Sequence, residues 1–286
     1  VNRKQMSVNG TTIHEGEDIS IDGFTGEVFA GRIDTIAPDI SHNDELRRLL
    51  EWADEVRRLA IRANADTPND AAQARAFGAH GIGLCRTEHM FFQAERMPFV
   101  QRMLMSAGHV ARLEQVVRDA RLVLQQAGGV NAELTGHVKE AESALLSDAE
   151  SLAYGEALAK LEEYQTADFI GILRTMDGLP VVIRLLDAPL HEFLPPLESL
   201  IEEVATLRAS KAPASDLAEK EHLLDQARSL RESNPMLGHR GSRLGLTYPA
   251  IYEMQVRAIL AAPNRLKGEG LDPRPEIMMP LVMGKA

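Results

Sequence analysis

The chain has 286 residues, of which 44% are hydrophobic and 26% charged, which is enough for one large α/β domain or two smaller ones. Its formal net charge of −11 argues against general binding to nucleic acid or to an anionic membrane, since either would repel such a surface. No apolar run approaches the roughly 20 residues that span a bilayer. The first residues also lack the apolar stretch of a signal peptide, so we expect a cytoplasmic protein.

The beginning of the chain predicts short strands and one helix. β-Branched residues at 7–12 and 18–28 lie among Asn-Gly, Asp-Gly and Thr-Gly turn signals, a pattern typical of short β structure. From 44 to about 60, leucine, alanine and valine recur at helical spacing, with Ser41 and Asn43 available as N-caps. We therefore expect one amphipathic connecting helix after the short strands.

A β-α-β pattern comes next. Residues 59–64 predict a strand, Thr67-Pro68 opens a helix that Gly78 closes, and residues 81–85 predict a second strand. Strands joined through a helix in this way form a parallel pair.

The remaining chain alternates long helices with apolar strands. Helices are expected at 108–127, 139–164 (after Gly128-Gly129), 198–209, 215–232 and from Pro249, with a further helix before the strand at 179–186 and a last strand at 276–282. About five strands thus alternate with helices, and their continuous apolar runs suit a parallel sheet covered on both faces. A (β/α) barrel or a doubly wound sheet is consistent with this order of strands and helices. A closed barrel needs about eight strands, so either the chain is incomplete or the barrel interpretation is wrong.

Two arginines interrupt or end apolar strands. Arg184 lies within one of these runs, and a buried guanidinium needs an anionic partner. That partner is either a structural one such as Asp187 or the carboxylate or phosphate of a substrate. Arg86 ends another run, where the polar residues of a β/α barrel form the active face, and the alternative is a salt bridge to Glu88.

A third arginine, Arg240, lies in the glycine-punctuated segment 234–245, where the backbone can approach a ligand closely. Such spacing is by itself a weak phosphate signal. Three arginines that end or follow separate strands are more informative together, because arginine gives planar bidentate hydrogen bonds that suit a small dianion. The competing interpretation treats all three as structural and the chain as an interaction module.

Other residues give weaker signals. The nine histidines show no metal-ligand spacing, so we interpret them as exposed or structurally hydrogen-bonded. The single Cys85 can form no internal disulfide and lies in an apolar run, which favours a small buried hydrophobe over a nucleophile. No P-loop is present. The residues predict neither a metal site nor a P-loop nucleotide site.

Several segments resemble one known family. GIGLCRTEHMFF at 81–92, LPVVIRLLDAPLHEFLP at 179–195 and NPMLGHRGSRLG at 234–245 resemble the pyruvate, phosphate dikinases among the PEP-utilising enzymes. ANADTPNDAAQARAFGAHG, ahead of the first segment, and EIMMPLV at 276–282 belong to the same pattern. Enzyme I of the sugar phosphotransferase system and phosphoenolpyruvate synthase share the barrel, but PLHEFLP is similar to the dikinases in particular.

The resemblance implies an α/β fold: an incomplete (β/α)8 TIM-type barrel with additional helices, preceded by a short β tail of a swivelling domain. Expected boundaries are 1–31 for the tail of that phosphohistidine domain, 32–60 for a linker and connecting helix, and 61–286 for the first part of a PEP/pyruvate-binding barrel. Residues near 106–150 are expected to be a helical insertion whose role is unknown.

The resemblance also implies a function. The family interconverts ATP, pyruvate and phosphate with AMP, phosphoenolpyruvate and diphosphate through a phosphohistidine, using Mg²⁺. Arg86, Arg184 and Arg240 match the arginines that grip phosphoenolpyruvate. The ATP site, the phosphohistidine, the metal ligands and the catalytic cysteine are expected outside this chain, so it has no complete catalytic set and is inactive alone.

Expected partners are phosphoenolpyruvate or pyruvate, the swivelling domain and a second copy in a homodimer. The alternative is a non-catalytic paralogue that retains an anion-binding barrel fragment for regulation or assembly, with the inserted helices as a docking surface.

Overall fold

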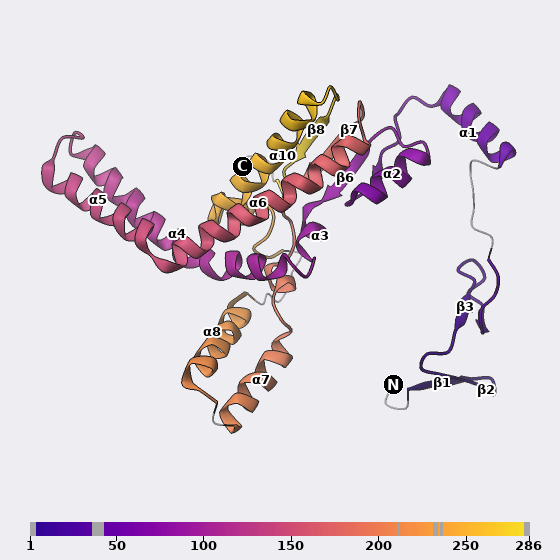
Figure 1. The fold of residues 1–286 in the computed structure, drawn as a ribbon, viewed down its shortest axis with the longest axis horizontal. Coiled ribbons are helices and arrows are strands. Elements are labelled where there is room, and N and C mark those ends of the chain that lie inside the picture. The colour runs from indigo at the N-terminus through magenta and orange to yellow at the C-terminus, as the bar shows by residue number, and fades with distance from the viewer. Residues whose placement is uncertain (1–3, 36–42, 211, 231–233, 235–236, 283–286) are drawn as a thin grey trace. The chain divides into compact units, whose positions relative to one another are not determined.

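A computed structural model describes residues 4–35, 43–210, 212–230, 234 and 237–282 (Figure 1). The chain divides into two compact units, Val1–Arg58 and Leu59–Ala286.

The first unit begins with two antiparallel hairpins. Strand β1 (Gln5–Val8) pairs with β2 (Thr11–His14), and β3 (Ile19–Ile21) pairs with β4 (Val28–Ala30). The first turn is Asn9-Gly10, whose φ angles of 51° and 83° fit the twist of a tight two-residue hairpin. The predicted short β structure is confirmed.

Helix α1 (Asp44–Val56) follows in the same unit. The Asn43 side chain accepts a hydrogen bond from the Leu46 N–H at 2.9 Å, which satisfies one of the unpaired amides at the helix start. Ser41, the other predicted cap, lies outside the described residues. The helix has no buried residue, and most of its apolar side chains, Trp52 among them, are exposed. Its apolar stripe therefore has no covering partner among the described residues of this unit.

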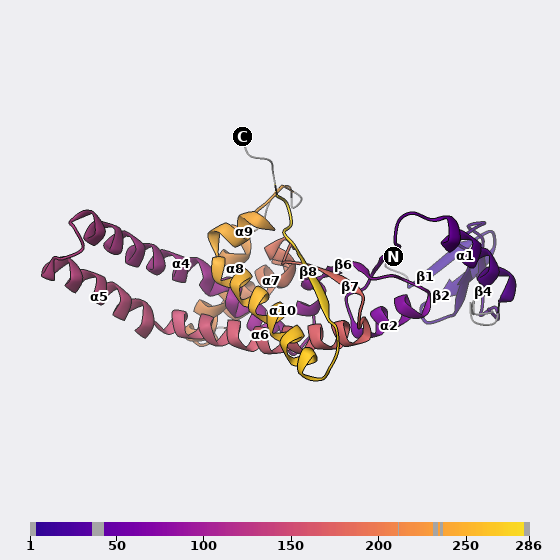
Figure 2. The same cartoon turned by 90° about the horizontal axis from the view of Figure 1, so that it is seen from above.

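The second unit contains a four-stranded parallel sheet (Figure 2). Its order is β5 (Ala63–Asn64), β6 (Ile82–Arg86), β7 (Pro180–Arg184) and β8 (Arg274–Met278). The described residues of this unit thus form four parallel strands where the sequence predicted about five. The α/β class and the parallel pairing are confirmed.

Strand β8 is shorter than predicted because the chain turns after Met278. Pro280 has no N–H with which to extend the ladder, and Leu281 has a φ of 54°. The backbone oxygen of Pro280 instead accepts a hydrogen bond from the Ser242 N–H at 3.1 Å, and the Ser242 hydroxyl donates to the Leu281 oxygen at 3.0 Å. The predicted extension of the strand to Val282 is wrong, since this segment contacts the loop after Arg240.

The helices of the second unit are α2 (Pro68–Ala76), α3 (Thr87–Phe91), α4 (Met97–Gln126), α5 (Ala132–Ser147), α6 (Ala149–Thr175), α7 (Leu197–Ala209), α8 (Ala214–Leu230), α9 (Ser242–Thr247) and α10 (Pro249–Gly268), with a 3₁₀ turn at Leu190–Phe193. Helix α2 starts as predicted, with Thr67 and Asp70 forming a capping box. The short helix α3 was not predicted. Residues 231 and 232 of the predicted helix at 215–232, and Pro235 and Met236 of the segment at 234–245, lie outside the described residues.

Helices α4, α5 and α6 form a long helical arm (Figure 1). Helix α4 starts at Met97, well before the predicted residue 108, and Pro98 suits its first turn. The predicted single helix at 139–164 is wrong, because Asp148 breaks it into α5 and α6. The Asp148 side chain accepts a hydrogen bond from the Ser151 N–H at 2.9 Å and so caps α6.

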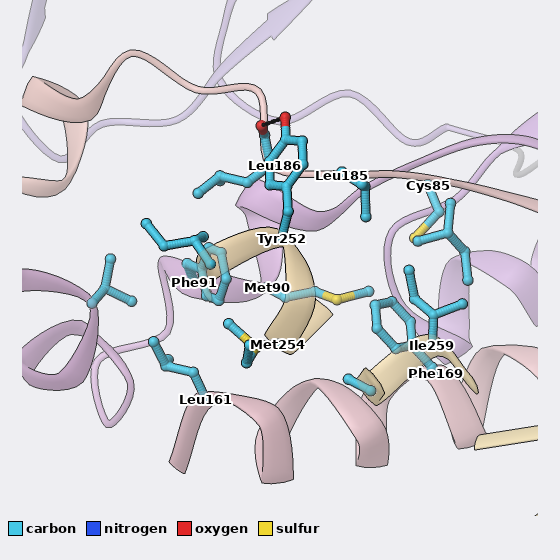
Figure 3. Close-up of a cluster of buried hydrophobic side chains, with 14 of the residues drawn as sticks. Cys85, Met90, Phe91, Leu161, Phe169, Leu185, Leu186, Tyr252, Met254 and Ile259 are labelled. Carbon is cyan, nitrogen blue, oxygen red and sulfur yellow. Dashed lines mark hydrogen bonds between the residues drawn. The ribbon is translucent and has the colours of Figure 1, made fainter. Parts of the chain in front are cut away.

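One hydrophobic core joins the sheet to α4, α6 and α10. The core side of the sheet is formed by Ile82, Cys85, Val181 and Ile183, all fully buried. Figure 3 shows Cys85 near Phe169 of α6 and Ile259 of α10. A separate small cluster holds α7 against α8. The large core fixes the strands, and with them the edge at which β5, β6 and β7 end.

Candidate anion-binding site

The three predicted arginines meet at the carboxyl end of the sheet. Arg86 and Arg184 are the last residues of β6 and β7 and are direct register partners. Neighbouring strands lie about 4.8 Å apart, and partnered residues of a parallel pair face the same side. Arg240, in the loop before α9, has its Nε 2.8 Å from the Oδ1 of Asp187, which lies just beyond β7. The fold thus groups the residues that the sequence singled out.

Arg184 is paired with two buried carboxylates. Its Nη2 donates to Oε1 of Glu88, and its Nη1 lies 3.3 Å from Oδ2 of Asp187. The Asp187 pair that the sequence offered as the structural alternative is therefore present, and Glu88 adds a second partner. The Nε of Arg184 and the Oε2 of Glu88 are buried without a hydrogen-bond partner among the described residues. This half of the site has an unused donor and an unused acceptor.

The salt bridge from Arg86 to Glu88, which the sequence offered as the alternative to a substrate role, is not formed. Helix α3 begins directly after β6, and this turn directs the Glu88 side chain to Arg184 of the next strand. Arg86 instead has its Nη1 3.9 Å from Oδ2 of Asp66, a loose contact. Its side chain is 34% exposed, against 19% for Arg184 and 12% for Arg240. Arg86 is therefore the most accessible and the least neutralised of the three.

Asp187 links two of the arginines. It contacts Arg184 through Oδ2 and Arg240 through Oδ1, while Arg240 Nη2 also donates to the Asp187 backbone oxygen. Gly241, which follows Arg240 in the chain, has a φ of 59°, and a Cβ added to it would lie 3.0 Å from Asp187 Oδ1. Glycine is favoured here on both counts, although the close approach is to the Asp187 side chain, whereas the sequence predicted an approach to a ligand.

A buried polar network that the sequence did not reveal supports the end of β7. The Thr87 hydroxyl donates to the Arg184 backbone oxygen at 2.9 Å and accepts from the Gln255 amide at 3.0 Å. Gln255 accepts from the Leu186 N–H at 2.8 Å, and the Tyr252 hydroxyl donates to the Leu186 oxygen at 2.9 Å (Figure 3). Burial raises the pKa of Tyr252, which keeps its hydroxyl a donor. In the sequence, the signal that could have revealed this network was Gln255, a polar residue among the apolar residues of the helix predicted from Pro249.

Asp66 and His89 were also missed. Asp66 follows β5, and its Oδ1 accepts the backbone N–H of Arg86 at 2.5 Å. Its Oδ2 lies 2.7 Å from Nδ1 of His89. A carboxylate just beyond a predicted strand, at the edge where the arginines lie, could have indicated this residue.

Cys85 belongs to the core and not to the site. It is fully buried, and burial raises the pKa of its thiol, with Asp66 adding a smaller effect of the same sign. The interpretation of Cys85 as a small buried hydrophobe is confirmed. In the part of the chain that the structure describes, no three His, Cys, Asp or Glu side chains are placed to hold a metal ion. No helix within the described ranges combines the length and apolarity needed to cross a bilayer.

The fold and the site define an α/β protein with arginines gathered at the carboxyl edge of a parallel sheet, and arginine has the charge and planar geometry that suit small anions. The family model of the PEP-utilising enzyme, PEP-binding domain, matches residues 41–285, and the chain belongs to this family. The resemblance found in the sequence is confirmed.

Curated relatives narrow the class further. The pyruvate, phosphate dikinase of Giardia intestinalis is 41% identical over 283 residues, which cover 99% of this chain and 26% of the relative. That of Entamoeba histolytica is 39% identical over 282 residues, covering 99% of this chain and 27% of the relative. The chloroplastic pyruvate, phosphate dikinase 1 of Arabidopsis thaliana is 41% identical over 283 residues, covering 98% and 24%. The chain thus spans about a quarter of the length of these relatives.

Proposed function

We propose that this chain is part of a pyruvate, phosphate dikinase and supplies arginines of its phosphoenolpyruvate/pyruvate site. In this proposal the whole enzyme interconverts ATP, pyruvate and phosphate with AMP, phosphoenolpyruvate and diphosphate through a phosphohistidine. The observation that carries the proposal is the convergence of Arg86, Arg184 and Arg240 on one edge of the sheet. The length and identity of the match to the dikinases support the same reading.

The roles of the arginines follow from their surroundings. Arg86 is the most exposed and is held only loosely by Asp66, so it makes the first contact with an incoming phosphate or carboxylate. Arg184 and Arg240 are fixed through Asp187, which presents them in one orientation before ligand arrives. Fixed positive charge of this kind stabilises negative charge that develops on a transferring phosphoryl group.

Magnesium does not enter the steps derived from this chain. Glu88 and Asp187 pair with arginines, and Asp66 contacts His89 and Arg86. These carboxylates therefore do not fit a metal site as they stand. We propose that the Mg²⁺ ligands, the phosphohistidine, the ATP site and the catalytic cysteine of the whole enzyme lie outside this chain, which is inactive alone.

The remaining expectations are part of the same proposal. Residues 1–31 are the tail of the swivelling domain, 32–60 the linker and connecting helix, and 61–286 the first part of an incomplete (β/α)8 barrel. Four parallel strands alternating with helices support the barrel. The exposed apolar side chains of α1 support its assignment as a connecting helix that is not part of the hydrophobic core. The swivelling domain and a second copy in a homodimer are the proposed partners. Cytoplasm is the proposed compartment, although some relatives are named chloroplastic.

A second candidate is a non-catalytic paralogue that uses the same anion site for regulation or assembly. Helices α4 and α5 of the helical arm favour this second candidate, because apolar side chains on them and on the loop between them, such as Leu122, Val130 and Leu146, are exposed and could form a docking surface. The insertion expected near 106–150 would cover most of these two helices. Both candidates require the arginine edge to bind a dianion, and they differ in whether the complete gene product transfers phosphate.

Calorimetric titration of the chain with phosphoenolpyruvate tests the proposal. Arg86→Met is the sharpest variant, because Arg86 is accessible and its removal leaves no deeply buried charge without a partner. We expect its affinity to fall roughly 10- to 100-fold with its thermal stability retained. Arg62→Met is the matched control: its side chain is 33% exposed and pairs with Glu276 at 2.8 Å. Equal binding by both variants, or no binding by the folded parent chain, would overturn the proposal.

A further inference from the structure

Helix α3 presents a single exposed residue, His89, beside the arginines. The other four residues of this helix, Thr87, Glu88, Met90 and Phe91, are buried. His89 is about half exposed and lies at the carboxyl end of β6, three residues beyond Arg86. It contributes nothing to the core, so packing does not account for its position.

Asp66 holds the His89 ring in one tautomer. The carboxylate is acceptor-only, so the Nδ1 at 2.7 Å from its Oδ2 must carry the proton that it shares. The Oδ1 of Asp66 is fixed by the Arg86 backbone N–H, which ties the ring to the end of β6. The Nε2 of His89 has no partner among the described residues, so its lone pair is available to a proton.

The charges around the site are balanced before any ligand binds. Arg86, Arg184 and Arg240 are matched by the carboxylates of Asp66, Glu88 and Asp187. Phosphoenolpyruvate has one negative charge on its carboxylate and about two on its phosphate. It places these charges beside three carboxylates that are mostly shielded from water. The site then carries excess negative charge, which is costly in partly buried surroundings.

We propose that anion binding at this edge is coupled to uptake of one proton by Nε2 of His89. This inference rests on the proposed function, since it requires a dianion at the arginine site. The proton comes from the buffer, forms the Nε2–H bond and converts the ring to imidazolium. The new N–H donates a charge-assisted hydrogen bond to the bound anion and restores part of the lost charge balance. His89 is therefore a positioning residue for the ligand.

The other charged groups around the site do not take that proton. Both oxygens of Asp187 contact arginine nitrogens, Glu88 pairs with Arg184 through Oε1 while its Oε2 is buried without a partner among the described residues, and Asp66 is engaged by Arg86 and His89. Arg243, in the first turn of α9, donates to backbone oxygens of the Leu237-Gly238 turn. Histidine is the side chain whose charge ordinarily changes near neutral pH, which leaves His89 as the group that responds.

The test is titration calorimetry with phosphoenolpyruvate at about pH 7.5, where phosphate monoesters are almost fully ionised. Each protein is titrated in two buffers of different ionisation enthalpy, and the difference in heat gives the number of protons taken up. His89→Asn is the variant of choice, because its amide can still donate to Asp66 but has no group at the Nε2 position. A thermal melt establishes that the variant is folded.

His109→Asn provides a matched control. His109 also pairs with a carboxylate, its Nε2 lying 3.1 Å from Asp148, but on the helical arm away from the arginines. We expect the parent and His109→Asn to take up the same fraction of a proton. We expect His89→Asn to lose that uptake and to bind roughly 3- to 10-fold more weakly.

Two outcomes overturn separate claims. If His89→Asn binds with the proton uptake of the parent, whatever its affinity, the coupling to His89 is wrong and the proposed function stands. If the folded parent chain does not bind phosphoenolpyruvate, the proposed function fails and the coupling fails with it.

Discussion

Replacing Arg184 with methionine tests how far the arginine edge is built into the fold. Methionine keeps much of the side-chain stem but removes the guanidinium that pairs with Glu88 and Asp187. Asp187 keeps Arg240 at 2.8 Å, whereas Glu88, 8% exposed, has no other ion-pair partner among the described residues. The cost is therefore that of leaving one buried carboxylate unpaired.

A buried charge that loses its partner typically costs about 3–5 kcal/mol of unfolding free energy, and we expect Arg184→Met to fall in this range. Glu88→Gln removes the charge but keeps a polar group, so its cost is about 1–3 kcal/mol. Combining both changes removes the unpaired charge. We expect the double variant to be at least about 2 kcal/mol more stable than the sum of the single effects predicts.

The assay needs a probe within the second unit. The single Trp52 lies in α1 of the first unit, so its fluorescence does not report on the arginine edge. Urea unfolding followed by far-ultraviolet circular dichroism reports on the long helices, and thiol labelling of Cys85 reports on β6 itself. The two probes together show whether the strand opens with the rest of the unit.

Arg208→Met is the control for loss of an arginine as such. Arg208 pairs with Glu221 at 2.6 Å, but its side chain is 64% exposed. Exposed pairs contribute about 0–1 kcal/mol, so this variant should unfold almost as the parent does. An equally small effect for Arg184→Met would refute the reasoning, as would a double variant no more stable than the sum of its parts. A loss of stability alone does not exclude ligand binding, because Arg184 is already paired without ligand.

Two further predictions concern Cys85 and Asp148. Burial raises the pKa of the Cys85 thiol, so we expect it to react with a disulfide reagent at least about 100-fold more slowly in the folded chain than in urea, and similar rates would contradict its place in the core. The hydrogen bond from the Ser151 N–H lowers the pKa of Asp148 in the folded state. The charged carboxylate therefore stabilises the folded state at pH values above the unfolded pKa of about 3.9. This stabilisation is lost as the pH falls through the lower pKa of the folded state. Asp148→Asn keeps the capping oxygen without the charge, so its urea midpoint should lie below that of the parent at neutral pH and meet it in acid; a gap that persists in acid would be evidence against the charge.

Much of the scaffold was readable from the sequence because it depends on local pattern. Continuous apolar runs predicted β6 and β7, and cap residues located the starts of α1 and α2. The predicted element boundaries were wrong where two local sequence signals competed. Asp148 ended one helix and began the next within an otherwise helical pattern, and Pro280 turned the chain out of an apolar run that resembled a strand.

The sequence by itself determined that Arg86 and Arg184 needed anionic partners, because a guanidinium in or at the end of an apolar run cannot be buried alone, and it singled out Arg240 by the glycines around it. Only the tertiary structure decided which partners they have. Glu88 is two residues from Arg86 yet pairs with Arg184, 96 positions away along the chain. Asp66 reached the site because β5 and β6 end at the same edge. Strand order and the direction of the α3 turn set these distances, and both are consequences of packing in the core that no local spacing encodes.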